Sequence, residues 1–172
     1  MLTLISTILT AIFFGGLASA IFTQLFLRFR EDREYRLHKL EELYVLVDEH
    51  CNKFVNYITD YMKKIKSGNW ETGTKPTEES HKGYSTIVMI INVYFANLLP
   101  ALQNIEDAKN LFVTSVGDYV ENAIPQTDCI EQMAECVFKI NAFGHELKQK
   151  IIAHAGNVRK ETFFNRVDGD CV

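Results

Sequence analysis

The helical character of this chain is clearest in residues 28–66, which read RFREDREYRLHKLEELYVLVDEHCNKFVNYITDYMKKIK. The segment contains neither glycine nor proline, and its apolar residues recur alternately three and four positions apart. This spacing predicts one long helix whose apolar seam packs in a bundle. Cations in the last turn and Gly68 beyond it predict the end of the helix. The predicted seam consists of Leu37, Leu40, Tyr44, Val47, Cys51, Phe54, Ile58, Tyr61 and Ile65.

The residues before this segment carry no charged side chain, and the first charge in the chain is Arg28. A helix of about 20 apolar residues crosses the ~30 Å hydrocarbon core of a bilayer. Basic residues gather on the cytoplasmic side of such a span, which places the N-terminus outside and residues from Arg28 onward in the cytoplasm. We therefore expect residues 1–27 to form a single-pass transmembrane anchor.

A cleavable signal peptide is the competing interpretation, because Ala18, Ser19 and Ala20 look like a small-residue cleavage site. A signal peptide, however, carries its positive charge before an apolar region of about 7–15 residues. Here no lysine or arginine precedes the run, and its apolar character continues as far as Leu27. An uncleaved anchor is the preferred interpretation.

Small residues recur at every fourth position of the predicted span. On a helix this spacing forms a shallow stripe, along which transmembrane helices can approach each other closely. The alternative is that small residues are simply frequent in this segment. We expect the spans to self-associate, and a helix unbroken from the anchor to Lys66 would transmit movements of the cytoplasmic part to them. The predicted oligomer face consists of Thr7, Ala11, Gly15, Ser19 and Thr23.

The remainder of the chain also has helical periodicity. A polar loop is expected over residues 67–83, and a helix from Tyr84 that Pro100 must kink or restart. The β-branched run 87–93 resembles a strand locally, but the helical spacing continues beyond it. Asp128 and Glu131 are spaced as a capping box that opens a last helix, which Gly156 would close.

The predicted fold class is therefore all-α, with a single N-terminal transmembrane helix followed by a cytoplasmic helical bundle of three to four long helices. Its expected parts are the anchor 1–27, the juxtamembrane helix 28–66, the loop 67–83 and the remainder of the bundle, 84–172.

Composition and motifs give little indication of an enzyme. The net charge of −4 does not favour a general nucleic-acid binder, and no duplex partner is expected. The four cysteines lack metal-ligand spacing, and His145–Glu146 lacks the second histidine of a zincin, so we expect neither metal, cofactor nor catalytic residue. Arg33 and His38 match the R-x4-H spacing of HEPN ribonucleases, which leaves that activity as a minor alternative.

A basic cluster near the C-terminus is the candidate binding site. Cations with neighbouring amide and aromatic groups suit a phosphorylated, base-bearing ligand. The alternative is that these cations only complement a helix C-terminus and solvate the surface. His154 is the sharpest candidate, since it falls on the apolar seam, but a satisfied core histidine is the preferred interpretation of that position. The predicted ligand-binding residues are Lys150, His154, Asn157, Arg159 and Lys160.

This layout, an N-out anchor of residues 1–27 and a small helical domain without a catalytic motif, resembles the membrane-anchored cyclic-oligoadenylate-binding effectors of type III CRISPR systems. The resemblance implies a tetramer in the bacterial inner membrane that binds cyclic tetra-adenylate and perturbs the membrane in antiviral defence. It rests on the layout, so it transfers no binding residue. The alternative function is a membrane-tethered helical adaptor that recruits a protein partner.

Overall fold

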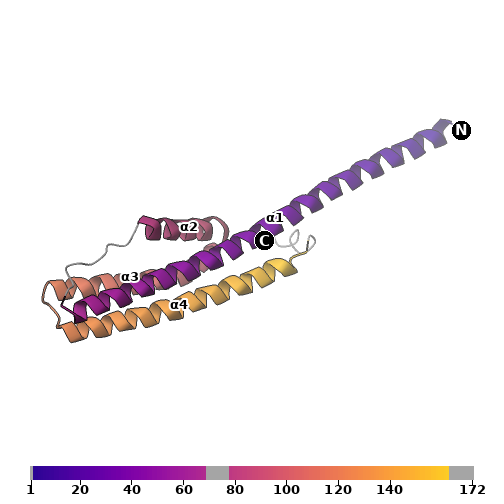
Figure 1. Ribbon diagram of the computed structural model, residues 1–172. Coiled ribbons are helices and arrows are strands. Elements are labelled where there is room, and N and C mark those ends of the chain that lie inside the picture. Colours follow the sequence, from indigo (N-terminus) through magenta and orange to yellow (C-terminus); the bar gives the residue numbers. More distant parts are fainter. Residues whose placement is uncertain (1, 69–77, 163–172) are drawn as a thin grey trace. The chain divides into compact units, whose positions relative to one another are not determined.

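The computed structural model describes the backbone of residues 2–68 and 78–162, and the side chains of residues 15–68 and 83–162. These residues form four α-helices and one 3-10 helix, with no strand among them, so the all-α prediction is confirmed for this part of the chain (Figure 1). The elements are α1 (Leu2–Lys66), α2 (Glu78–Tyr94), η2 (Ala96–Leu98), α3 (Leu99–Val120) and α4 (Gln126–Lys160).

The chain divides into two compact units. The bundle unit comprises Lys39–Ala155, and the terminal unit comprises Met1–His38 together with Gly156–Val172. Both boundaries fall inside helices, because α1 and α4 each contribute residues to both units.

The predicted anchor, residues 1–27, is helical from Leu2, and α1 continues without a break to Lys66. The side chains of residues 1–14 lie outside the described part of the chain, and these include the predicted contacts Thr7 and Ala11. Among the residues that are described, no helix meets the length and apolarity that a membrane crossing requires.

The end of α1 agrees with the prediction. Its last turn carries three lysines, which complement the negative end of the helix dipole. Gly68 has φ +75° and donates its N–H to the carbonyl of Ile65 at 3.1 Å. A glycine adopts this left-handed conformation without the steric cost that a Cβ brings, so it can close the helix.

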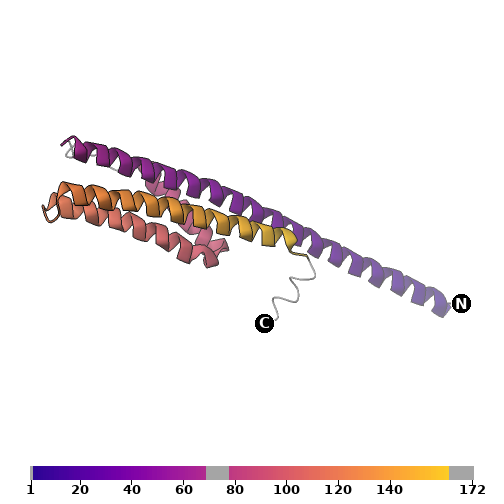
Figure 2. The ribbon, with the colours of Figure 1, turned by 90° about the horizontal axis from the view of Figure 1, so that it is seen from below.

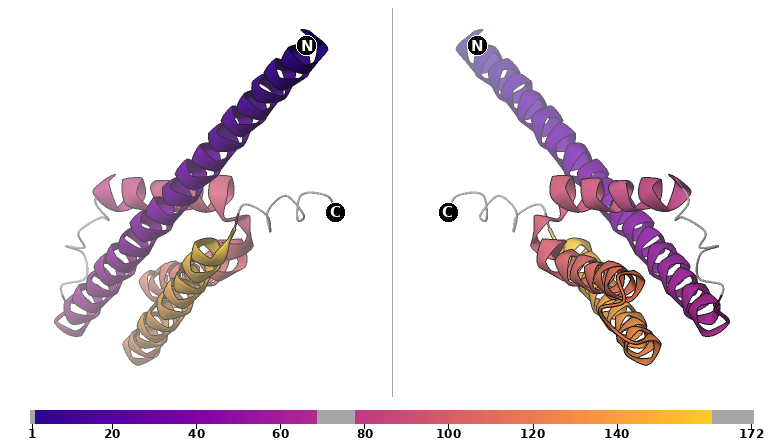
Figure 3. Two further views of the ribbon diagram at one scale, coloured as in Figure 1. Left: turned by 90° about the vertical axis from the view of Figure 1, so that its right-hand side faces the viewer. Right: turned by 90° about the vertical axis from the view of Figure 1, so that its left-hand side faces the viewer.

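In the bundle unit, α3 and the part of α4 that belongs to this unit run alongside α1 (Figure 2). Helix α2 crosses α1 obliquely (Figure 3). The core is aliphatic: Leu43, Ile58, Ile90, Ile140 and Leu147 are each 0% exposed. The predicted seam on α1 needs one correction, because Tyr44 is 37% exposed while neighbouring Leu43 is buried. A helix packed against several others buries a stripe wider than a heptad seam, and the centre of that stripe shifts to Leu43.

The break around Pro100 is confirmed as a restart of the helix. Phe95 has a non-helical φ of −141°, η2 follows, and Pro100 lies in the first turn of α3. Proline is tolerated there because the first turn of a helix has no intrahelical acceptor for its missing N–H. The strand alternative for residues 87–93 is wrong, since they belong to α2.

Three predicted boundaries are wrong. α2 begins at Glu78, six residues before Tyr84. α4 begins at Gln126 directly after Pro125, which makes Asp128 a first-turn residue near the positive helix end instead of the capping residue. α4 also passes Gly156 and ends at Lys160, with Val158 only 1% exposed, because an apolar contact offsets the weak helix preference of one glycine.

Candidate functional site

His154 lies on α4 against the junction of α2 and η2, inside the bundle unit. Its ring packs edge-on against Phe95, with ring centroids 5.2 Å apart and planes at 74°. The Nδ1 atom of His154 lies 3.4 Å from Nδ2 of Asn97. An amide nitrogen only donates, so Nδ1 of His154 is the acceptor of this pair. His154 is half-buried.

Lys150 precedes His154 by one turn of α4 and shares its face. Its Nζ lies 2.7 Å from a carboxylate oxygen of Glu146, and the two side chains are 47% and 45% exposed. Exposed pairs of this kind contribute only about 0–1 kcal/mol, so an anionic ligand can replace Glu146 at little cost. Phe95, Asn97, Lys150 and His154 are together called the His154 site.

Of the five predicted binding residues, His154 packs against Phe95 and lies near Asn97, and Lys150 lies one turn away on the same helix, paired with Glu146. The other three, Asn157, Arg159 and Lys160, are exposed and belong to the terminal unit. The sequence did not identify Phe95 or Asn97, which lie more than fifty residues from His154 along the chain. Pro100 indicated that the chain turns nearby, but nothing in the sequence indicated which helix the turn meets.

A second basic residue of the same region, Lys148, is engaged in the bundle. Its Nζ lies 2.5 Å from Asp48 on α1 and 5.8 Å from the ring centroid of Tyr44. The hydrogen bond that Lys148 donates to Asp48 is the largest cause of the raised pKa of Lys148. This lysine links α1 to α4 and stays charged at neutral pH.

A polar and aromatic cluster joins α1, α2 and α3. Lys109 on α3 places its Nζ 4.0 Å from the ring centroid of Tyr84 on α2 and 2.6 Å from Glu106. The ring of His50 on α1 lies 5.1 Å from that of Tyr84, and His50 is 8% exposed. Burial, followed by the hydrogen bond with Glu106, raises the pKa of the Tyr84 hydroxyl. Lys109, Glu106 and Tyr84 satisfy one another, as expected of a structural contact.

The described cysteines are unsuited to nucleophilic chemistry. Cys51, Cys129 and Cys136 are buried, and burial raises the pKa of the Cys51 and Cys136 thiols to about 11. A thiol of this kind stays protonated near neutral pH, and the thiolate is the reactive form. The described residues contain no group of His, Cys, Asp and Glu side chains arranged to hold a metal ion.

The R-x4-H pair lies in the terminal unit, where Arg33 is half-buried and His38 is exposed. Five residues at 100° per residue place the two side chains about 140° apart around α1. The two residues therefore occupy different faces of the helix, and neither their sequence spacing nor α1 alone brings them together.

The described part of the predicted span is exposed on all sides. Its large apolar side chains Leu17, Ile21, Phe22, Leu25, Phe26 and Leu27 are each between 43% and 61% exposed. On the predicted oligomer face, a Cβ built at Gly15 meets nothing within 4 Å, and the Thr23 hydroxyl donates to the Ser19 carbonyl at 2.8 Å. The space beside Gly15 is open, and the Thr23 hydroxyl has an acceptor within its own helix.

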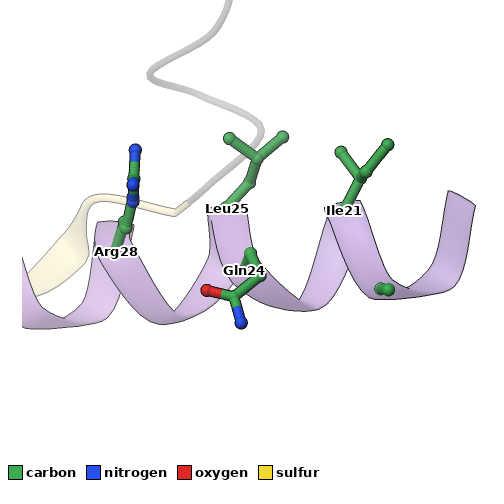
Figure 4. Close-up of a pocket in the computed structure, with 5 residues that line it drawn as sticks. Ile21, Gln24, Leu25 and Arg28 are labelled. Carbon is green, nitrogen blue, oxygen red and sulfur yellow. The ribbon is translucent and has the colours of Figure 1, made fainter. Parts of the chain in front are cut away.

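A hollow follows another face of the same segment. It is lined by Ala20, Ile21, Gln24, Leu25 and Arg28, and Figure 4 shows Ile21, Leu25 and Arg28 pointing to the same side of the helix. Three of the five lining residues are apolar, and the polar ones are Gln24 and the cation Arg28 at the C-terminal end.

Comparison with protein-family models, with curated proteins and with solved structures gives no match.

Proposed function

We propose that the protein is a membrane-anchored effector whose helical bundle senses a phosphorylated ligand and acts on the membrane through self-associating N-terminal helices. The observation that carries this proposal is the uncharged run before Arg28 together with the exposure of its apolar side chains. Large apolar side chains around the whole circumference of a helix are stable in lipid and unfavourable in water.

The charge pattern supports one orientation. The cations Arg28, Arg30, Arg33, Arg36 and Lys39 follow the run directly, and no cation precedes it. The positive-inside rule then places the N-terminus outside the inner membrane and the bundle unit in the cytoplasm. The bundle unit is the part that meets soluble ligands in this arrangement.

The His154 site supports the sensing role. It combines an exposed cation with an imidazole, an amide and an aromatic ring, groups that bind phosphate and base edges. The layout resembles that of the cyclic-oligoadenylate effectors of type III CRISPR systems, so cyclic tetra-adenylate is the ligand to test first. A tetramer and a role in antiviral defence belong to the same proposal.

The anchor is tested by membrane fractionation of the full chain expressed in bacteria. We expect it in the membrane pellet after alkaline carbonate extraction. Phe13→Arg and Phe14→Arg, at the centre of the run, should release it, because a central arginine costs about 2.5–3.5 kcal/mol of insertion. Val45→Arg is the control, since Val45 is 53% exposed on the bundle unit. Wild-type protein in the soluble fraction would contradict the proposal.

Ligand sensing is tested on the detergent-solubilised full chain by thermal unfolding with cyclic tetra-adenylate and with common nucleotides. Saturation at about a hundredfold excess over Kd stabilises the folded state by about 2.7 kcal/mol. Lys150→Gln and His154→Ala should reduce the shift. Lys139→Gln is the matched control. Lys139 pairs with Glu135 one turn away on α4, just as Lys150 pairs with Glu146.

The adaptor is the competing outcome of this experiment. An unshifted midpoint with every nucleotide, together with a stoichiometric partner protein that stays bound to the bundle unit, would favour the adaptor over the sensor. RNA cleavage that Arg33→Ala and His38→Ala abolish would favour the ribonuclease.

A further inference from the structure

The hollow on α1 of the terminal unit has an ordered chemical profile along the helix axis. Ile21 and Leu25, one turn apart, are 52% and 46% exposed, and Arg28 follows within the next turn (Figure 4). At 1.5 Å per residue, the backbone positions of Ile21 and Arg28 are about 10 Å apart along the helix axis. This matches the order of parts in a phospholipid, whose acyl chain lies below its phosphate.

Arg28 differs from the other cations of this segment in its ion pairing. Arg30 pairs with Glu34 at 2.8 Å, Arg36 with Asp32 at 3.2 Å and with Glu161 at 2.5 Å, and Lys39 with Glu42 at 2.6 Å. Within the described part of the chain, Arg28 and Arg33 make no such pair. Arg33 is half-buried, whereas Arg28 is exposed and lines the hollow.

We infer that this face of α1 binds an anionic phospholipid, with the headgroup phosphate at Arg28 and an acyl chain along Ile21 and Leu25. The inference rests on the proposed membrane anchoring, because it requires Arg28 to lie at the level of the headgroups. A guanidinium without an acidic partner donates to phosphate oxygens without first losing a salt bridge. The apolar lining favours a lipid over a soluble phosphate.

The test uses the full chain reconstituted in phosphatidylcholine vesicles with trace spin-labelled lipid. Electron paramagnetic resonance measures the fraction of labelled lipid that the protein immobilises, for phosphatidylglycerol and for phosphatidylcholine. We expect phosphatidylglycerol to be preferred, and Arg28→Gln to reduce this preference about fivefold, the factor for one basic side chain at an anionic surface. Arg30→Gln removes the same charge from a paired position and should leave most of the preference.

Each other outcome counts against the inference. Equal immobilisation of phosphatidylglycerol and phosphatidylcholine overturns it. An equal loss of the phosphatidylglycerol preference in Arg28→Gln and Arg30→Gln also overturns it, because such a loss would reflect net charge alone. Replacing chloride by inorganic phosphate at equal ionic strength should leave the preference intact, and its selective loss would indicate a site for free phosphate. Wild-type protein that fails to enter the vesicles contradicts the anchor itself, which separates that failure from the failure of lipid selectivity.

Discussion

At the scale of single residues, Gly144 on α4 faces Cys51 on α1 with no room for a larger side chain. A Cβ built there would lie 2.8 Å from Sγ of Cys51. We expect Gly144→Ala to lower the free energy of unfolding by about 1 kcal/mol, because overpacking by about 1–3 kcal/mol outweighs the better helix preference of alanine. Chemical denaturation followed by circular dichroism measures the change.

The matched control is Gly117→Ala on α3. A Cβ at Gly117 meets nothing within 4 Å, so this variant should gain about 0.5–1 kcal/mol. Adding Cys51→Ala to Gly144→Ala removes the clashing sulfur and should recover part of the loss. A stabilised Gly144→Ala single variant would show that the two helices do not meet as closely as described.

The buried thiols of Cys51 and Cys136 should make the stability of the fold depend on pH in the alkaline range. Burial raises the pKa of Cys51 and Cys136 from the ordinary value of 9.0 to about 11. The contribution of the protonated thiols to the free energy of unfolding is complete below the thiol pKa of the unfolded chain. It is lost as the pH rises through the thiol pKa of the folded protein. The thermal midpoint should therefore fall between about pH 9 and about pH 11. The thermal midpoint of the double variant Cys51→Ala/Cys136→Ala should fall less steeply with pH than that of the wild type. Equal slopes for the two proteins would refute this account.

At the scale of the elements, α2 is attached to α3 through Tyr84. The Nζ of Lys109 lies 4.0 Å from the Tyr84 ring centroid, and Glu106 accepts a hydrogen bond from the hydroxyl. Tyr84→Phe loses only the hydrogen bond, about 1 kcal/mol, whereas Tyr84→Ala also loses ring packing and should cost about 3 kcal/mol. Amide hydrogen exchange should rise along α2 in that order. Val93→Ala, at a 63% exposed position of α2, should change little.

The sequence predicted the elements well where one physical cause dominates. α1 has an uninterrupted apolar period and a glycine at its end, and α3 restarts at Pro100 as proline chemistry requires. Prediction was wrong where tertiary contacts decide. α4 continues past Gly156 because Val158 is buried, and no local signal reveals that contact. For the same reason the sequence could not predict that Phe95 and Asn97 lie beside His154, because they meet this residue only through packing.

At the scale of the whole molecule, Arg36 connects two distant parts of the sequence within the terminal unit. Its guanidinium contacts both carboxylate oxygens of Glu161, at 3.3 Å and 2.5 Å, across 125 positions of the chain. A two-pronged pair with side chains 19% and 32% exposed should contribute about 1 kcal/mol. Arg36→Gln and Glu161→Gln should each speed amide exchange in the last turn of α4. The double variant should add little, and additive effects would exclude a direct pairing.

The proposed action on the membrane depends on how several copies pack through their spans. The small face offers Gly15, Ser19 and Thr23, while Leu17 and Ile21 lie on the other side of α1, about 200° from Gly15 and Ser19 respectively. In a background without native cysteines, we expect Ser19→Cys and Thr23→Cys to cross-link between copies in native membranes, because small faces allow close approach. Leu17→Cys and Ile21→Cys should cross-link much less.

The same cysteines test whether the bundle unit controls the spans. A ligand shifts an equilibrium between two arrangements only if it binds them with different affinities. If cyclic tetra-adenylate is such a ligand, its addition should change the ratio of cross-linking at Ser19→Cys to that at Ile21→Cys, and His154→Ala should abolish the change. Equal cross-linking at all four positions, or none at any, would exclude self-association through the small face. The bundle unit could then act only through a separate partner.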